Sequence, residues 1–157
     1  MNVRPLPAQE GERPVAAGAF DRVTWALRRA ELAMQAVKEP RLRSLGLSVA
    51  HYSLLISVHN HPGLTGAELA RRMGVTPQAV AALADRLVGR GQVERRTHPR
   101  HRRVQELHLT AAGRAVLRLA DAVVAEIELK ITEQLGRADT ATLRALLERV
   151  AVAAREL

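Results

Sequence analysis

The stretch that decides the fold is residues 65–91, which read TGAELARRMGVTPQAVAALADRLVGRG. Thr65 is followed three positions later by Glu68, which is the spacing of a capping box at the start of a helix. Gly74 then interrupts the apolar pattern, and glycine is the residue that passes through a left-handed turn without strain. These features predict one short helix that ends in a tight turn at Gly74.

A second helix is predicted directly after that turn. Thr76 is placed to cap it, and Pro77 stands at its first position, where a missing backbone N–H costs nothing. The helical pattern runs to about Arg90, between two glycines. The pair therefore has the spacing of a helix-turn-helix. Small and apolar residues at helical spacing would pack the two helices together: Leu69, Ala70, Met73, Val75, Val80 and Leu83.

Residues 93–109, VERRTHPRHRRVQELHL, predict a β-hairpin behind this helix pair. Its strands are expected at 93–96 and 104–109, with Leu107 and Leu109 on the inner side. A basic hairpin straight after a helix-turn-helix is typical of the wing of a winged helix. The helix would enter the major groove of DNA, where the base edges can be read, and the wing would reach the neighbouring backbone or minor groove.

Four further helices surround this unit. The first is predicted at 21–38, ended by Glu39 and Pro40, and the second at 49–60, capped by Ser48. A third runs from Thr110 to about Leu135, and the last begins at Asp139. The apolar residues of the last helix are expected to face inward: Leu143, Leu146, Leu147, Val150 and Ala154. The first helix has a second apolar face at Trp25 and Leu32, so we expect it to be covered by something besides its own domain.

Composition narrows the function. The chain has 157 residues and no cysteine, which excludes disulfides, thiolate zinc sites and cysteine nucleophiles. Its net charge is +8, and residues 66–109 carry nine arginines against four carboxylates, whereas residues 110–157 are balanced. Basic charge gathered on a helix-turn-helix and hairpin favours nucleic acid over a membrane surface. Aromatic residues make up 2%, which argues against a stacking platform for single strands.

The sequence resembles the MarR family of bacterial transcription regulators. The resemblance rests on the helix pair within 69–87, on the wing at 93–103, and on Leu109-Thr110-Ala111-Ala112-Gly113, which is similar to the family's Leu-Thr-x-x-Gly start of the fifth helix. It implies a mainly α, winged-helix fold with six helices and a two-stranded β-wing. It also implies a homodimer formed through the N- and C-terminal helices.

These observations together predict the domain organisation. Residues 1–19 are expected to be a flexible arm, and 20–157 a MarR-like domain with a winged helix-turn-helix core at 45–109 and dimerisation helices at 20–38 and 110–157. The arm lacks the apolar core of a signal peptide, and no run of 18 apolar residues occurs, so we expect a cytoplasmic protein with no membrane partner.

The resemblance and the basic hairpin together predict the DNA-binding residues. Two recognition helices about one helical turn apart imply a palindromic double-stranded operator. His98 and His101 stand where the family's wing usually has aspartate, so the tip is more positive than is usual. Ala82 stands where the family often has arginine, which leaves base reading to Thr76, Gln78 and the wing. The predicted contacts are Thr76, Pro77, Gln78, Ala82, Arg86, Arg95, Arg96, Arg100, Arg102 and Arg103.

The resemblance also implies a small aromatic or anionic effector that relieves repression. Trp25, His51 and Tyr52 are the candidate lining of its pocket, with ordinary packing as the alternative. No cofactor, metal site or catalytic constellation is expected. Two other functions stay open: a winged-helix module that binds protein without specific DNA binding, and a metal-responsive regulator that uses His51, His59 or His108.

Overall fold

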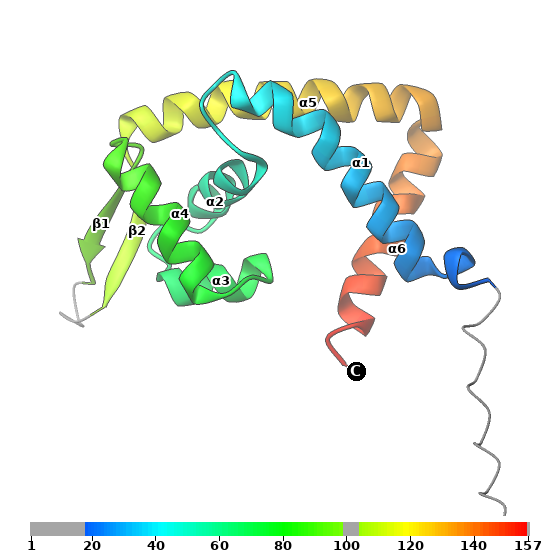
Figure 1. The fold of residues 1–157 in the computed structure, drawn as a ribbon, viewed down its shortest axis with the longest axis horizontal. Helices are drawn as coiled ribbons and strands as arrows, with labels where there is room; N and C mark the ends of the chain where they lie inside the picture. The colour runs from blue at the N-terminus through cyan, green and yellow to red at the C-terminus, as the bar shows by residue number, and fades with distance from the viewer. Residues whose placement is uncertain (1–17, 99–103, 157) are drawn as a thin grey trace, which may run out of the picture. The chain divides into compact units, whose positions relative to one another are not determined.

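The computed structural model describes residues 18–98 and 104–156 (Figure 1). The chain divides into two compact units, Met1–Ala36 and Val37–Leu157. None of the helices in the described ranges is both long and apolar enough to cross a membrane. The elements in chain order are a 3-10 turn at Ala19–Asp21, α1 (Val23–Arg43), α2 (Val49–Asn60), α3 (Gly66–Met73), α4 (Pro77–Gly89), β1 (Val93–Thr97), β2 (Gln105–Leu109), α5 (Ala111–Leu135) and α6 (Arg137–Ala153).

The helix-turn-helix is built as its sequence predicts. Thr65 Oγ1 accepts from the backbone N–H of Glu68, and the Glu68 side chain accepts from that of Thr65, so α3 begins in a complete capping box. Gly74 has φ 66° and ψ 30°, the left-handed turn that the glycine permits. Thr76 then caps α4, with Pro77 at its first turn. These local hydrogen bonds fix where both helices begin.

The wing is a two-stranded antiparallel sheet with Val93 opposite Leu109 and Thr97 opposite Gln105. Leu107 and Leu109 are buried, as the alternation predicts. A third chain segment meets the sheet, because the Leu107 N–H donates to Leu64 O over 3.0 Å. The wing is therefore attached to the start of α3 as well as to the end of α4.

One core holds the winged helix together. Leu54, Leu55 and Val58 of α2 are buried in the same cluster as residues of α3, α4, both strands and α5. Leu69, Val80 and Leu87 are fully buried there. Full burial of one such side chain contributes about 1.5–3 kcal/mol, so the cluster fixes how α4 and the wing are presented to solvent.

The prediction that Pro40 ends the first helix is wrong, because α1 continues through Pro40 to Arg43. Proline removes one backbone donor, but tertiary contacts hold the last turn. Leu42 is fully buried, and the Glu39 carboxylate accepts from the Val49 N–H over 3.0 Å. Packing of that turn against the core outweighs the missing hydrogen bond.

Two predictions about the last helix are also wrong. It begins at Arg137 after an N-cap at Gly136, and Asp139 is in its first turn, where a negative charge interacts favourably with the helix dipole. Its apolar side chains do not face inward, since no residue of α6 is buried. Leu146, for example, is 48% exposed.

The prediction that Val75 fills the shared helix core is likewise wrong, since its side chain is 41% exposed. Its backbone N–H donates to Ala70 O as the chain leaves α3, and the turn directs the side chain outward. Leu83 and Met73 are partly buried against the core, and Leu69, Ala70 and Val80 are fully within it.

Candidate nucleic-acid interface

The solvent face of α4 has small side chains over its first two turns. Gln78 and Ala82 are exposed there, together with Ala79 and Ala81, whereas Val80 and Ala84 are buried in the core. An alanine-rich face lets a helix approach another surface closely. Gln78 is the one long side chain on this part of the helix, and its amide can donate and accept at once.

Thr76 and Pro77 have structural tasks at the start of the same helix. Thr76 Oγ1 accepts from the Ala79 N–H over 3.1 Å, so that hydroxyl is already used as a cap, although the residue itself is exposed. Pro77 is exposed beside it. Both residues are close to any ligand that approaches the N-terminal end of α4.

The two arginines of β1 are each paired with a carboxylate. Arg95 Nη2 donates to Asp85 Oδ1 over 2.7 Å, which ties the wing to the exposed face of α4. Arg96 pairs with Glu94 on the same strand. A phosphate that binds either guanidinium would therefore compete with Asp85 or Glu94. Arg100, Arg102 and Arg103 lie outside the described residues, as does His101.

A carboxylate on β2, Glu106, has two histidine neighbours. Glu106 Oε2 lies 2.9 Å from His108 Nε2, and Glu106 Oε1 lies 3.7 Å from His98 Nε2. His98 therefore lies beside an acid of the opposite strand. No group of three or more His, Asp or Glu side chains within 18–98 and 104–156 is arranged to hold a metal ion.

His51 has a structural role that the sequence did not reveal. Its Nδ1 accepts from the Ser48 N–H over 3.2 Å and completes a capping box at the start of α2. Burial lowers the pKa of His51, and the positive charges of Arg90 and Arg86 lower it further. Arg86 is exposed and has no ion-pair partner among the described residues.

The other two candidate effector residues lie in different units. Trp25 is in the first unit, where its ring packs edge-on against Phe20 with centroids 5.2 Å apart. Tyr52 is in the second, and its hydroxyl donates to Asp121 Oδ1 over 2.9 Å. Burial raises the pKa of Tyr52 to about 12, and the hydrogen bond to Asp121 adds to the effect.

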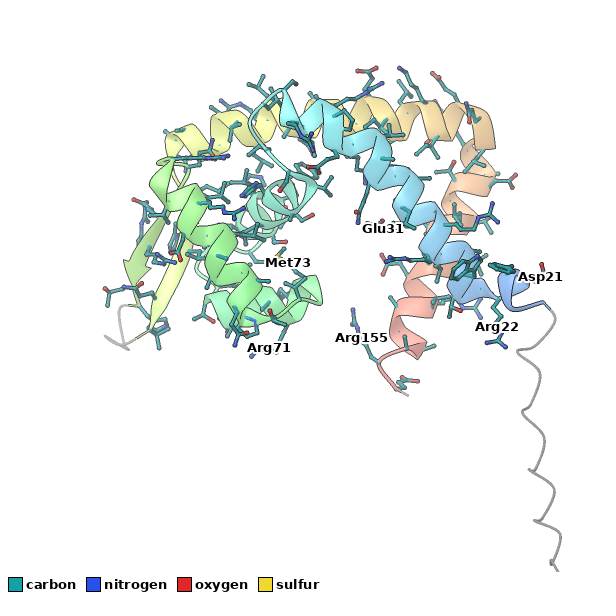
Figure 2. The ribbon with its side chains drawn as sticks, viewed as in Figure 1. Asp21, Arg22, Glu31, Arg71, Met73 and Arg155 are labelled. Carbon is teal, nitrogen blue, oxygen red and sulfur yellow. The ribbon has the colours of Figure 1, made fainter. Side chains whose placement is uncertain are left out.

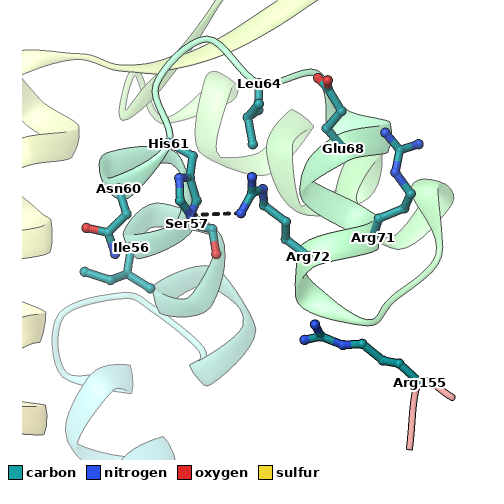
Figure 3. A pocket seen from close by; sticks show the side chains of 9 residues that line it. All are labelled: Ile56, Ser57, Asn60, His61, Leu64, Glu68, Arg71, Arg72 and Arg155. Atoms are coloured by element: carbon teal, nitrogen blue, oxygen red, sulfur yellow. Dashed lines mark hydrogen bonds between the residues drawn. The ribbon is translucent and has the colours of Figure 1, made fainter. Parts of the chain in front are cut away.

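A cavity of about 690 Å³ opens between the end of α2, α3 and the end of α6. Figure 2 locates Arg71 on α3 and Arg155 just after α6, and Figure 3 shows both side chains bordering the cavity with Arg72. None of the three residues proposed for the effector pocket from the sequence lines it.

Comparisons with known proteins agree with this architecture. The profile of the MarR family matches residues 45–104, which span the helix-turn-helix and β1 and end just before β2. The HTH-type transcriptional repressor Rv2887 of Mycobacterium tuberculosis is 33% identical over 109 residues, which is 69% of this chain and 78% of that protein. The multiple antibiotic resistance protein MarR of Escherichia coli is 30% identical over 110 residues, or 69% of this chain and 76% of its own.

The chain belongs to the MarR family. Two solved structures of the transcriptional repressor CouR extend the similarity over nearly all of the family domain. The one bound to a 23-mer DNA duplex has a TM-score of 0.79 and 31% identity, and covers 87% of this chain and 98% of that one. The one bound to p-coumaroyl-CoA has a TM-score of 0.74 and 32% identity, and covers 89% and 96%. Rv2887 and CouR are both named as transcriptional repressors.

The sequence alone did not indicate two features of this region: the ion pair of Asp85 with Arg95, and the cavity beside α3. Asp85 could have been noticed as an acid on the recognition helix ten residues before Arg95, but only the hairpin geometry brings the two together. Arg71 and Arg72 form a visible basic pair, whereas nothing in the sequence indicates that Arg155 borders the same cavity.

Proposed function

We propose that this chain is a sequence-specific, double-stranded DNA-binding repressor whose DNA affinity is lowered by a small-molecule effector. The observation that carries the proposal is the exposed, capped α4 joined to a basic wing through Arg95 and Asp85. In this proposal α4 and the wing act by binding DNA and carry out no catalytic step. A protein of this function works in the cytoplasm, where bacterial DNA lies.

Base reading by α4 would favour A·T pairs. The Gln78 amide can pair with N6 and N7 of adenine, and an alanine methyl such as that of Ala82 can contact the C5-methyl of thymine. The phosphate contacts would come from the wing and from Arg86. They would supply most of the affinity and make it depend on salt.

A homodimer would place two such helices on one palindromic operator. The exposed apolar residues of α6 support self-association, since Leu143, Leu146, Leu147 and Val150 are each more than one-third exposed in the single chain. Burial of this stripe against a second copy would remove it from water. Residues 110–157 are also electrically balanced, so the two copies would not repel each other there.

The effector proposal rests on the family relationship. A CouR structure contains p-coumaroyl-CoA, so a MarR-family protein 32% identical to this chain binds a small molecule. Trp25, His51 and Tyr52 remain a predicted pocket, although the Nδ1 side of His51 is used in a cap and the Tyr52 hydroxyl is used by Asp121.

Selection of binding sites from random duplex DNA tests the proposal. We expect a palindromic consensus, and Gln78→Ala should lose discrimination at one A·T position per half-site by about tenfold. Gln134→Ala, which removes an exposed amide from α5, is the matched control and should keep the consensus. If no sequence is enriched, specific DNA binding fails, and a module that binds protein becomes the better account.

A further inference from the structure

The cavity between α2, α3 and the end of α6 is bordered by three arginine side chains. Arg71, Arg72 and Arg155 border it, and all three are exposed. Among the described residues none of them forms an ion pair, and the one polar contact is between Arg72 Nη1 and His61 Nε2 at 3.4 Å (Figure 3). Like charges gathered this way repel one another unless an anion joins them.

The one acid in the cavity wall, Glu68, interacts electrostatically with Arg71 and Arg72 but offsets only one of the three positive charges. Glu68 Oε2 accepts from the Thr65 N–H over 2.8 Å and from Thr65 Oγ1 over 2.7 Å. These hydrogen bonds from Thr65 lower the pKa of Glu68, so its carboxylate is ionised and held at the start of α3. Some other arginines of the described residues do pair with acids, as Arg41 does with Glu126 and Arg95 with Asp85.

We propose that this cavity binds a small molecule that has a phosphate group and an apolar part. Three guanidinium groups offer planar, permanently charged forks, which suit the several oxygens and roughly −2 charge of a phosphate better than the single charge of a carboxylate. Ile56 and Leu64 supply an apolar wall on the α2 side. The volume of about 690 Å³ lies within the usual range for small-ligand sites.

Occupation of the cavity would oppose DNA binding, a step that rests on the proposed function. α3 is the first helix of the helix-turn-helix, so a bound phosphate would cancel positive charge directly beside the DNA-binding face. The same ligand would also connect α3 to the end of α6, and so couple the helix-turn-helix to the last helix of the chain. DNA and ligand would then each lower the affinity for the other by the same factor.

Calorimetric titration of the full chain with three probes tests the ligand class. Phenyl phosphate has the phosphate and the apolar ring, inorganic phosphate lacks the ring, and benzoate replaces phosphate with a carboxylate. We expect phenyl phosphate to bind at least about tenfold more tightly than either of the other two. Equal affinity for benzoate, or no binding of phenyl phosphate, would overturn the proposal.

Variants then locate the site. Arg72→Gln and Arg155→Gln should each weaken phenyl phosphate binding by about tenfold, because each removes a charged donor. Arg149→Gln is the matched control, since it removes the same charge from exposed α6 without bordering the cavity. Thermal melting checks that all three variants fold. Unchanged affinity in both cavity variants, or an equal loss in Arg149→Gln, would place the ligand elsewhere and refute the assignment.

DNA titrations with the same variants separate this inference from the proposed function. Without ligand, Arg72→Gln should bind the selected operator within about threefold of the wild type. If it loses DNA affinity and phenyl phosphate does not bind, the cavity serves the DNA backbone and the proposal is wrong. If phenyl phosphate binds as expected but no DNA does, the ligand site stands and the repressor function fails.

Discussion

Replacement of Gly113 by alanine should destabilise the fold at the point where α5 meets the wing. Gly113 lies in the first turn of α5, and a Cβ there would be 1.8 Å from the Gln92 carbonyl oxygen and 2.9 Å from its carbon. A carbon–oxygen contact needs about 3.3 Å, so the two backbones would have to separate by roughly 1.5 Å. Both contacting atoms belong to the main chain, which cannot rotate away as a side chain does.

The hydrogen bonds at this junction would be disturbed by that separation. The Thr110 N–H donates to Gln92 O over 3.2 Å, and Thr110 Oγ1 donates to Gly91 O over 2.6 Å. Overpacking costs about 1–3 kcal/mol, and a weakened hydrogen bond adds about 1 kcal/mol. Alanine gains about 1 kcal/mol of helix propensity over glycine, which offsets only part of this. We expect Gly113→Ala to lower the free energy of unfolding by about 1–3 kcal/mol.

Urea unfolding followed by circular dichroism measures this difference, at one fixed protein concentration because an oligomer's stability depends on concentration. Gly89→Ala is the matched control, since Gly89 is also helical and a Cβ there would meet nothing within 4 Å. That variant should be neutral or slightly more stable. A Gly113→Ala protein within about 0.5 kcal/mol of the wild type would refute the close approach of α5 to Gln92.

Three further predictions concern titration and base reading. Tyr52 is the sole tyrosine, so absorbance at alkaline pH should show no tyrosinate until the pH is well above the ordinary tyrosine pKa of 10. The Asp121→Asn variant should ionise at lower pH, because it removes the negative charge beside the Tyr52 hydroxyl. Ionisation of Tyr52 near pH 10 in the folded wild type would contradict the hydrogen bond. Burial lowers the pKa of His51 below 6.5, so the unfolded chain binds more protons and the free energy of unfolding should fall as pH drops below about 6.5. His51→Gln should reduce that fall in urea titrations, and an identical pH profile would exclude His51 as its source. Replacing thymine by uracil in the operator removes the methyl groups that α4 would contact, and this should weaken DNA binding about threefold per contacted base. Fluorescence anisotropy measures the Kd, and an unchanged value would exclude a methyl contact by Ala82.

The helix-turn-helix could be predicted from the sequence because its signals are local. The Thr65–Glu68 capping box and the left-handed Gly74 each depend on residues a few positions apart, and all are confirmed. The hairpin was found for the same reason, since strand alternation placed Leu107 and Leu109 inward. Local hydrogen bonds and short-range patterning decide such elements with little help from the rest of the chain.

Features that depend on distant contacts were missed or mistaken. Pro40 is a helix breaker by propensity, yet the burial of Leu42 carries α1 past it. Periodicity predicts an inward-facing stripe around Leu146, but this side chain is 48% exposed, because periodicity shows that a face is apolar and not which surface covers it. The Arg95–Asp85 pair and the basic cavity at Arg155 arise from the hairpin and the helix ends meeting in space, so no spacing in the sequence indicates them.

The central claim is that the capped α4 and its wing bind a specific DNA duplex largely through charge. The most direct test is a titration of the full chain onto the selected palindrome and onto a scrambled duplex at several salt concentrations. We predict at least about tenfold preference for the palindrome, and a loss of at least about a hundredfold in affinity between about 50 and 200 mM salt. Equal affinity for both duplexes, or an affinity that does not change with salt, would contradict the account.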